Sequence, residues 1–385
     1  MIEVSVVIPT LNEEKTIGIC IDKINKIFDK YQINGEIIVS DSSTDSTPDI
    51  AKSKGARVIH LKEKGYGNAY IGGINASKGK YIVIGDADNT YDFLEIPKFL
   101  DPLRNKEADF VIGNRFGGGI EKGAMPSLHR YIGNPLLTKI LNLFFHGKIS
   151  DAHCGMRGFT RDAWKKLDLK TGGMEFASEM IIKAIQKKLE IKEIPIKLYP
   201  REGGPAKINS FTDGWRHLRF MMLLAPNYLF MIPGLLLFGV GLMLMTLLLF
   251  GPLKIGMIKL DIHPMVLGSL LTLFGFQIIL YSFIVKEYGV TEGLIPESRT
   301  IHFYHSHFNL ESGLKIGMVI TILGFLFNLW ILLAWISKGM GAMHVSSLRV
   351  AILALTIFII GIEIMFTSFV MSIFNIKHIY STRRS

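Results

Sequence analysis

The fold is decided by the stretch Tyr81-Ile82-Val83-Ile84-Gly85-Asp86-Ala87-Asp88-Asn89-Thr90-Tyr91-Asp92. Its apolar, β-branched start stops at Gly85, which predicts a buried strand that leads into a loop. Asp86 and Asp88 in that loop offer hard oxygen ligands, through which a divalent cation can hold a diphosphate beside an open cleft. The alternative is a polar turn closed by an Asx cap. The rest of the chain helps to decide between the two.

Upstream of this stretch, short apolar runs alternate with amphipathic ones. Strands are predicted at 4–9, 36–41 and 57–60, each leading into a helix. Thr10 or Asn12 is the expected N-cap of the first helix. The apolar face of that helix is expected to hold Ile17, Ile21, Ile24 and Ile27. This alternation predicts an α/β domain with a parallel sheet, whose polar loops gather at the carboxyl ends of its strands.

The composition changes sharply near residue 225. Before it, both signs of charge are mixed as in a water-facing α/β domain, and the chain of 385 residues carries a net charge of +10. After it come four apolar runs of a length that can cross a hydrocarbon core of roughly 30 Å, at 228–250, 264–285, 314–336 and 348–374. We therefore expect a catalytic domain at 1–225 and a transmembrane domain of four helices at 226–385.

Charge and cysteine content narrow the function classes. A basic chain suits an anionic membrane surface and anionic substrates, whereas zinc spacings and recognition-helix signatures of nucleic-acid binding are missing from the sequence. Two cysteines are too few for a disulfide framework, which agrees with a reducing compartment. The first residues lead straight into a strand, and no cleavable signal is evident.

Four spans put both ends of the chain on one side of the membrane. The basic tail with Lys377, Arg383 and Arg384 favours the cytoplasm for that side, although basic residues on the other side narrow the margin. Those opposing residues are Lys254, Lys259 and Lys338. The loop with His302, His305 and His307 would face the catalytic domain as a lid or packing loop, with a metal site as the alternative.

Four motifs occur in order, at 7–14, 40–45, 64–69 and 86–88. Together they resemble family-two glycosyltransferases of the Rossmann-like glycosyltransferase-A fold, over roughly residues 1–225. The resemblance implies Mg²⁺ or Mn²⁺ bound by Asp86 and Asp88. It also implies a nucleotide site made by Pro9, Asn12, Glu13, Asp41, Gly65, Gly67 and Asp86. The chain departs from the pattern at Ser40, where many members have a second Asp, and at Thr90, where dolichyl-phosphate mannose synthases usually have Gln.

Three later segments, at 150–159, 172–176 and 201–207, resemble the polyprenyl-phosphate branch of that family. The resemblance adds Asp151, Arg157 and Glu175 to the site candidates. Ala206 replaces the usual Ser, which removes a possible hydroxyl contact. His153 and Cys154 are neighbours without a second ligand pair, so we do not expect them to bind a metal.

Two further stretches, near 126–146 and 208–224, alternate basic and apolar residues. Such a pattern predicts amphipathic helices that lie on a membrane face. The alternative is that they pack on the sheet. Two such stretches in one domain suggest that it rests against the lipid bilayer.

A lipid phosphate is the acceptor that this combination favours. A phosphate is already an anion at pH 7 and needs no general base, so the enzyme must supply cations around the anomeric carbon. Asp88, through its metal, would serve the leaving diphosphate. Arg115 and Arg130 are the candidates for gripping the acceptor phosphate, because guanidinium groups match it with paired hydrogen bonds. Asn134 is a further candidate at the acceptor phosphate, and Arg201 and Lys207 could support either that phosphate or the diphosphate. The alternative for these basic residues is a solvated or headgroup-facing surface.

The predicted reaction is inverting transfer of a hexose from a nucleotide sugar to a polyprenyl (dolichyl) monophosphate. Because Thr90 replaces the Gln that mannose synthases usually have near the metal, we slightly prefer UDP-glucose to GDP-mannose as the donor. A processive polysaccharide synthase would share the fold, but its Gln-x-x-Arg-Trp segment is missing from the sequence. A non-catalytic lipid-binding membrane protein is the other alternative. The spans are compatible with a homo-oligomer and fix neither its state nor the polyprenol length.

Overall fold

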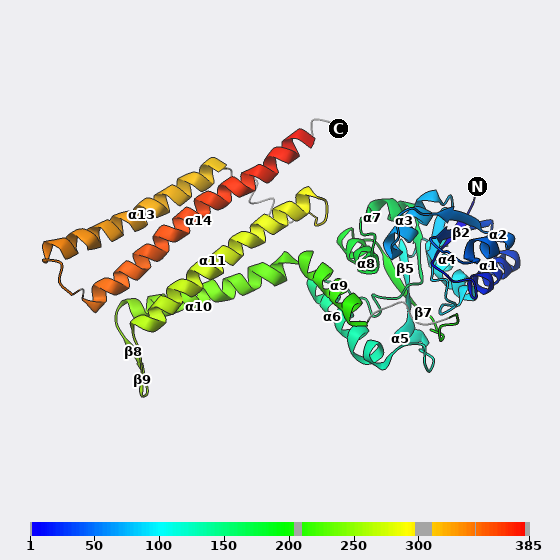
Figure 1. The fold of residues 1–385 in the computed structure, drawn as a ribbon, viewed down its shortest axis with the longest axis horizontal. Helices are drawn as coiled ribbons and strands as arrows, with labels where there is room; N and C mark the ends of the chain where they lie inside the picture. The colour runs from blue at the N-terminus through cyan, green and yellow to red at the C-terminus, as the bar shows by residue number, and fades with distance from the viewer. Residues whose placement is uncertain (1, 204–209, 297–309, 343, 382–385) are drawn as a thin grey trace. The chain divides into compact units, whose positions relative to one another are not determined.

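The computed structural model describes residues 2–203, 210–296, 310–342 and 344–381 (Figure 1). It divides into two compact units, Met1–Met221 and Met222–Ser385, where the sequence placed a boundary at 225/226. Several sequence candidates lie outside the described residues: Lys207, His302, His305, His307, Arg383 and Arg384. The side chain of Lys377 is also outside them.

Alternating strands and helices build the first unit. Its strands are β1 (Val4–Thr10), β2 (Gly35–Asp41), β3 (Arg57–His60), β4 (Tyr81–Ile84), β5 (Phe110–Asn114), β6 (Arg157–Thr160) and β7 (Ile191–Pro195). Its helices are α1 (Ile17–Tyr31), α2 (Thr47–Ser53), α3 (Tyr66–Ala76), α4 (Ile96–Arg104), α5 (Arg115–Gly118), α6 (Asn134–Phe145), α7 (Arg161–Leu167), α8 (Phe176–Gln186) and α9 (Ser210–Leu223). Short helical turns are η1 (Phe93–Glu95) and η2 (His129–Gly133).

The seven strands form one sheet in the order β3-β2-β1-β4-β6-β5-β7. β1 pairs in parallel with β2 and β4, as the alternation of strands and helices predicted. β6 is the exception, because it enters between β4 and β5 and runs antiparallel to both. Figure 1 shows α3, α7 and α8 on one side of the sheet and α1, α2 and α4 on the other. Covered on both faces, the central strands are buried, and β4 is buried at all four positions.

The predicted cap of α1 was wrong. The N-cap is Thr16, and its side chain makes no capping hydrogen bond. Thr10 and Asn12 instead serve contacts between loops: Thr10 Oγ1 donates to Asp41 Oδ1 at 2.8 Å, and Asn12 Oδ1 accepts from the Thr44 N–H at 2.8 Å. Asn12 has φ 55°, a left-handed conformation that Asn tolerates better than most residues. The polar residues after β1 thus tie two strand ends together.

The second unit is largely helical. It contains η3 (Asn227–Met231), α10 (Ile232–Leu249), β8 (Leu253–Ile255), β9 (Ile258–Leu260), α11 (Ile262–Thr291), α13 (Leu310–Ser337) and α14 (Val345–Ser381). Four segments are long and apolar enough to cross a membrane, as expected: Asn227–Leu249, Ile262–Thr291, Leu310–Ser337 and Val345–Phe374. Figure 1 shows α11 between α10 and α14, and α13 beside α14.

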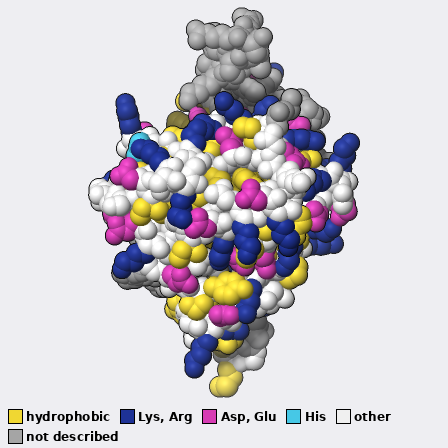
Figure 2. Space-filling model, turned by 90° about the vertical axis from the view of Figure 1, so that its right-hand side faces the viewer, with side chains coloured by type: hydrophobic (Ala, Val, Ile, Leu, Met, Phe, Trp, Pro, Cys, Tyr) yellow, Lys and Arg dark blue, Asp and Glu magenta, His cyan; other side chains and the backbone are white. Residues whose placement is uncertain are grey.

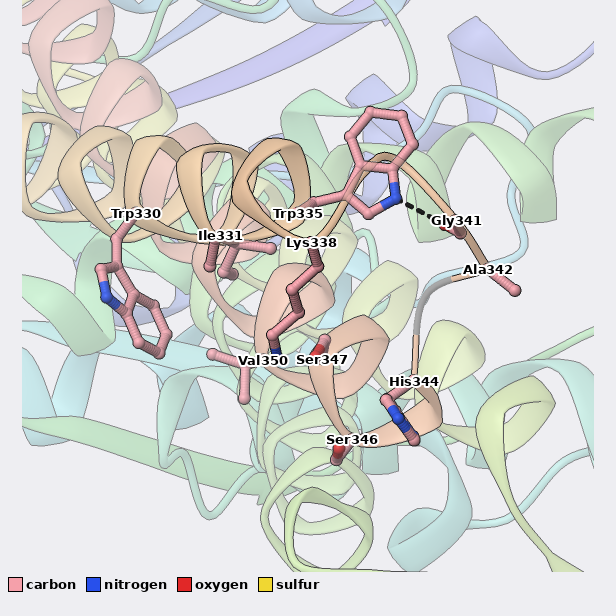
Figure 3. Close-up of a pocket in the computed structure, with 11 residues that line it drawn as sticks. Trp330, Ile331, Trp335, Lys338, Gly341, Ala342, His344, Ser346, Ser347 and Val350 are labelled. Atoms are coloured by element: carbon pink, nitrogen blue, oxygen red, sulfur yellow. Dashed lines mark hydrogen bonds between the residues drawn. The ribbon is translucent and has the colours of Figure 1, made fainter.

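A cavity of about 350 Å³ lies where α13 turns into α14 (Figure 3). Trp330, Trp335, Lys338 and His344 are among its lining residues. Trp335 Nε1 donates to the Gly341 carbonyl at 2.7 Å and holds the turn. Tryptophan and lysine at the end of a spanning helix are typical of the membrane–water interface.

Glycines allow the spanning helices to approach closely. A Cβ added to Gly241 in α10 would meet the backbone of Gly268 and Thr272 in α11. In the other hairpin, a Cβ on Gly324 would meet the backbone of Phe358. Close backbone contact of this kind supports association where lipid gives helices no hydrophobic drive to pair.

We expect Gly241→Leu to destabilise the second unit by about 1–3 kcal/mol, because the added side chain must separate α10 from α11. The measurement is thermal unfolding of the full chain in detergent. Gly239→Leu is the matched control, since a Cβ at Gly239 on the same helix meets nothing within 4 Å. Equal melting temperatures for the two variants would contradict this account.

Candidate active site

Asp86 and Asp88 follow the buried strand β4 at its carboxyl end. Asp86 Oδ1 accepts hydrogen bonds from Tyr66 Oη at 3.1 Å and from Tyr70 Oη at 3.0 Å, both on α3. Burial, together with the charge of Asp88, raises the pKa of Asp86 to about 6. A buried acid beside a second acid favours a bound cation, which would offset the repulsion between them.

Asp88 is held on both of its oxygens. Its Oδ1 accepts from the Thr90 N–H at 3.2 Å and from Thr90 Oγ1 at 2.6 Å. Its Oδ2 lies 2.8 Å from Nη1 of Arg201. The first contacts are the Asx turn that the sequence left as the alternative, and the second is an ion pair across the site. Asp88 therefore serves as a turn residue and also presents its carboxylate to a cation.

Asp41 ends β2, which β1 separates from β4 in the sheet, and is almost fully buried. Its Oδ1 accepts from Thr10, whereas its Oδ2 has no hydrogen-bond partner within the described parts of the chain. His60 Nδ1 is 3.4 Å from that oxygen. A buried carboxylate oxygen without a donor is costly, so this position suits a ligand N–H such as that of a nucleotide base.

The other residues expected at the nucleotide lie in neighbouring loops. Pro9 is part of β1, and the N–H of Asn12 donates to Ser43 Oγ at 2.8 Å. Gly65 precedes α3 with φ 144°, a conformation that favours glycine. A Cβ on Gly65 or Gly67 would meet the backbone of Thr171 or Gly172. In this structure the two glycines therefore let α3 approach the 171–173 loop, and a nucleotide contact by them stays a prediction.

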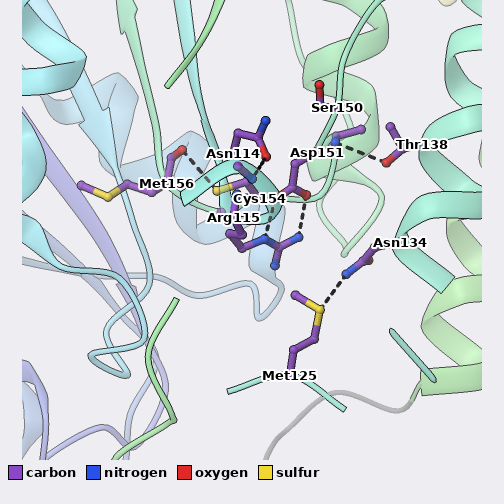
Figure 4. A network of polar contacts seen from close by, with 12 residues as sticks. Asn114, Arg115, Met125, Asn134, Thr138, Ser150, Asp151, Cys154 and Met156 are labelled. Carbon is purple, nitrogen blue, oxygen red and sulfur yellow. Dashed lines mark hydrogen bonds and ion pairs between the residues drawn. The ribbon is translucent and has the colours of Figure 1, made fainter. Parts of the chain in front are cut away.

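Arg115 and Asp151 form a buried, two-pronged ion pair (Figure 4). Arg115 Nε lies 2.7 Å from Asp151 Oδ2, and Nη2 lies 2.7 Å from Oδ1. The Arg115 N–H also donates to Oδ2 at 3.0 Å. The sequence offered Arg115 to the acceptor phosphate, but these contacts commit two of its guanidinium nitrogens. A phosphate contact by Arg115 would have to use Nη1 or the second N–H of Nη2.

Arg130 and Asn134 lie one helical turn apart, on η2 and α6, and both are partly exposed. Arg130 Nη1 donates weakly to the Ile120 carbonyl at 3.5 Å, and Asn134 Nδ2 lies 3.4 Å from Met125 Sδ. Weak neutral partners leave these two side chains able to turn toward a phosphate.

Arg157 has a structural role. Its guanidinium is buried and donates to the carbonyls of Ala152, Cys154 and Ala177 at 2.9–3.1 Å. It therefore fixes the loop that carries Asp151, together with the start of α8. Glu175 is the N-cap residue of α8 and is partly exposed.

His153 and Cys154 do not form a metal site in the described residues, where no group of three or more ligands gathers. Burial raises the pKa of the Cys154 thiol to about 12, which disfavours the thiolate that a metal would require. Both ring nitrogens of His153 are buried without a partner in the described chain, and its ring packs edge-on against His217 at 4.9 Å.

The structure adds residues that the sequence did not single out. Tyr70 shares Asp86 with Tyr66, and Tyr91 Oη accepts from the Gly155 N–H at 2.8 Å. Tyr66 lay within a quoted motif, and Tyr70 stands four residues later on the same helical face. That spacing was the available signal. Arg201, which the sequence offered to either phosphate, lies beside Glu13 and Asp88, and its phosphate contact stays a prediction.

Asp151→Asn should destabilise the first unit by about 3–5 kcal/mol, because it leaves the buried Arg115 guanidinium without a compensating charge. The check is the thermal unfolding midpoint of the full chain. Glu107→Gln removes one charge from the exposed pair with Lys192, 2.6 Å long, and should leave the unfolding midpoint nearly unchanged because water screens that pair. A small effect of both substitutions would show that Arg115 does not depend on Asp151.

The first unit is a three-layer α/β unit with paired acids after a central strand, and four helices long and apolar enough to span a membrane follow it. Residues 5–168 match the family model described as glycosyl transferase family 2, and residues 284–375 match the family 2 C-terminal transmembrane region. The chain belongs to glycosyltransferase family 2, in the branch of the dolichyl-phosphate hexose synthase type. The predicted family and fold class are thus confirmed, and the protein is a multi-pass membrane protein.

Two relatives from Haloferax volcanii illustrate the match. The low-salt glycan biosynthesis hexosyltransferase Agl6 is 44% identical over 368 residues, which are 95% of this chain and 88% of the relative. A dolichyl-phosphate hexose transferase is 33% identical over 55% of this chain and 89% of its own length. Among solved structures, a glucosyl-3-phosphoglycerate synthase from Mycobacterium tuberculosis matches with a TM-score of 0.46 and 24% identity, over 57% of this chain and 78% of that one.

Proposed function

We propose that this protein transfers a hexose from a nucleotide sugar to a dolichyl (polyprenyl) monophosphate, with inversion at the anomeric carbon. The observation that carries the proposal is the pair Asp86 and Asp88 at the same edge of the sheet as buried Asp41, whose Oδ2 accepts no hydrogen bond within the described residues. The names of the two Haloferax relatives, a hexosyltransferase and a dolichyl-phosphate hexose transferase, support the same class of reaction.

Donor binding would use the carboxyl ends of β1, β2 and β4. Asp41 Oδ2 would accept an N–H of the base, and Asn12 and Glu13 would border the nucleotide. Asp86 and Asp88 fit Mg²⁺ or Mn²⁺, with diphosphate oxygens and water completing a coordination shell that two carboxylates leave open. When bound, such a cation supplies Lewis-acid stabilisation to the departing diphosphate. UDP-glucose is our slightly preferred donor over GDP-mannose.

Acceptor binding would use the basic residues around η2 and α6. The phosphate oxygen attacks directly and needs no proton removed at neutral pH, so positioning and electrostatics carry the catalysis. Arg130 and Asn134 would hold the phosphate. Arg115, fixed by Asp151, would offer the phosphate the N–H groups that Asp151 leaves free, and Arg157 positions the loop that holds Asp151.

Exposed apolar side chains are unevenly distributed over the first unit, in a way that suits a lipid acceptor. Figure 2 shows a face of that unit where Lys and Arg alternate with Asp and Glu and hydrophobic side chains are scattered. Along η2 and α6, by contrast, five large apolar residues are more than half exposed: Leu128, Tyr131, Ile132, Leu136 and Leu143. Trp215 on α9 is also exposed. We propose that η2, α6 and α9 lie on the bilayer, with the catalytic unit in the cytoplasm.

The first test is sugar transfer by purified full-length protein with polyprenyl phosphate, Mg²⁺ or Mn²⁺, and labelled UDP-glucose, GDP-mannose or UDP-N-acetylglucosamine in separate reactions. We expect label in an organic-extractable, mild-acid-labile lipid from one donor. Asp88→Asn should lower turnover by about 100-fold or more, because it weakens stabilisation of the leaving group. Asp101→Asn, an exposed acid on α4, is the matched control.

Two results would overturn this proposal. Long water-soluble chains would identify a polymer synthase, and absence of turnover from every donor would favour a lipid-binding protein.

Membrane contact by α6 predicts an acceptor-dependent defect. Leu136→Glu should lower kcat/KM about tenfold for long-chain polyprenyl phosphate in vesicles, because a charge on the apolar face weakens seating at the bilayer. With a short, water-soluble isoprenyl phosphate as acceptor, the variant should have the same kcat/KM as the wild type. Ile19→Glu, at an exposed apolar position on α1, should affect neither acceptor. Equal loss with both acceptors would indicate a folding defect instead of lost membrane contact.

A further inference from the structure

The side chain of Arg201 bridges two acids of the donor site. Its Nη1 lies 2.8 Å from Asp88 Oδ2, and its Nη2 lies 2.5 Å from Glu13 Oε1. The three side chains are only 8–21% exposed. We propose that Arg201 stands in for the metal cation in the unliganded protein and moves to the diphosphate when metal and donor bind together. This inference rests on the metal-dependent donor site of the proposed function.

The segment that carries Arg201 is anchored to the loop it serves. The Tyr199 N–H donates to the Thr90 carbonyl at 3.0 Å, and the Glu202 N–H donates to the Asp88 carbonyl at 3.4 Å. Glu13 is fixed from the other side, since its N–H donates to Thr47 Oγ1 at 2.9 Å. Backbone contacts on both sides of Arg201 therefore hold its guanidinium at the acids. The ion pair is built into the fold and is not a chance surface contact.

Arg201 and a metal ion compete for the same oxygen. Asp88 Oδ1 is already engaged by Thr90, so Oδ2 is the atom that a cation would use most directly. A metal arriving alone must displace the guanidinium from Oδ2 and then lie beside its positive charge. Both effects weaken binding of the metal alone.

A diphosphate removes the competition between Arg201 and the metal for Asp88 Oδ2, and the repulsion between them. Guanidinium groups bind phosphate oxygens with paired hydrogen bonds, so Arg201 can exchange Asp88 for the donor's diphosphate. Its Nε is buried without a partner among the residues described, and this donor is a further point that a phosphate oxygen can satisfy. Metal and diphosphate should consequently bind with positive coupling, each raising the affinity of the protein for the other.

The test measures Mn²⁺ binding to the full-length protein in detergent by electron paramagnetic resonance, with and without pyrophosphate. The binding of Mn²⁺ to pyrophosphate in buffer is measured separately and subtracted. In the wild type we expect weak binding of Mn²⁺ alone, strengthened by pyrophosphate. Arg201→Gln should bind Mn²⁺ alone about tenfold more tightly and show a coupling about tenfold smaller, because only direct contact between metal and diphosphate then remains.

Two further variants keep the test decisive. Arg201→Lys retains the charge without the two-pronged geometry, so its affinity for Mn²⁺ alone should lie between those of wild type and Arg201→Gln. If Arg201→Gln does not fold, the Mn²⁺ affinity of Arg201→Lys alone tests the inference. Arg104→Gln removes another arginine–carboxylate pair, with Glu3 at 2.9 Å, and should bind Mn²⁺ like the wild type.

Unchanged or weaker Mn²⁺ binding in both Arg201 variants would overturn the inference, and would mean that Arg201 only holds the acids in place. That outcome leaves the proposed function standing. Failure of all variants, wild type included, to bind Mn²⁺ with or without pyrophosphate would instead overturn the metal-dependent donor site itself, and the inference with it.

Discussion

Parallel pairing of β1 with β2 and β4 is the constraint on which the site depends. Val7 lies beside Ile38 on one side and Ile84 on the other, so the three strands end at the same edge of the sheet. The polar residues that follow them are therefore brought together although they are far apart in the chain. Burial of these strands on both faces fixes the register, because a slip would move polar residues into the core.

Charge is the second constraint, since the site gathers acids at one edge. Each acid has its own partners. Asp86 accepts hydrogen bonds from two tyrosine hydroxyls, Asp88 accepts from Thr90 and pairs with Arg201, and Asp151 pairs with Arg115. Asp41 keeps one oxygen that accepts no hydrogen bond in the described chain, with His60 Nδ1 3.4 Å away. The acids that are satisfied internally build the site, and the one that is not indicates where a ligand belongs.

The membrane unit follows a different rule. Inside lipid, apolar burial does not pull helices together, so backbone approach at glycines replaces it. Gly241 and Gly268 meet in one hairpin, and Thr321 and Gly361 meet in the other. An ion pair also links two of its helices: Arg349, near the start of α14, pairs with Asp261, the N-cap residue of α11. The same chain thus uses hydrophobic layering in one solvent and small-residue contact in the other.

Sequence alone determined what local patterns encode. The β-branched run before Gly85 specified a buried strand, the order of four motifs specified the family, and the length of the apolar runs specified four spans. These features depend on neighbouring residues or on composition, so a single chain displays them directly.

Only the tertiary structure decided the long-range partners. The pairing of Arg201 with Asp88 joins residues 113 positions apart, and β6 enters the sheet in reverse after a long excursion. The sequence listed Arg115 and Asp151 separately, and their contact turned a proposed phosphate ligand into half of an ion pair. Such contacts depend on which loops the sheet brings to one edge, and local sequence propensities do not determine which loops those are.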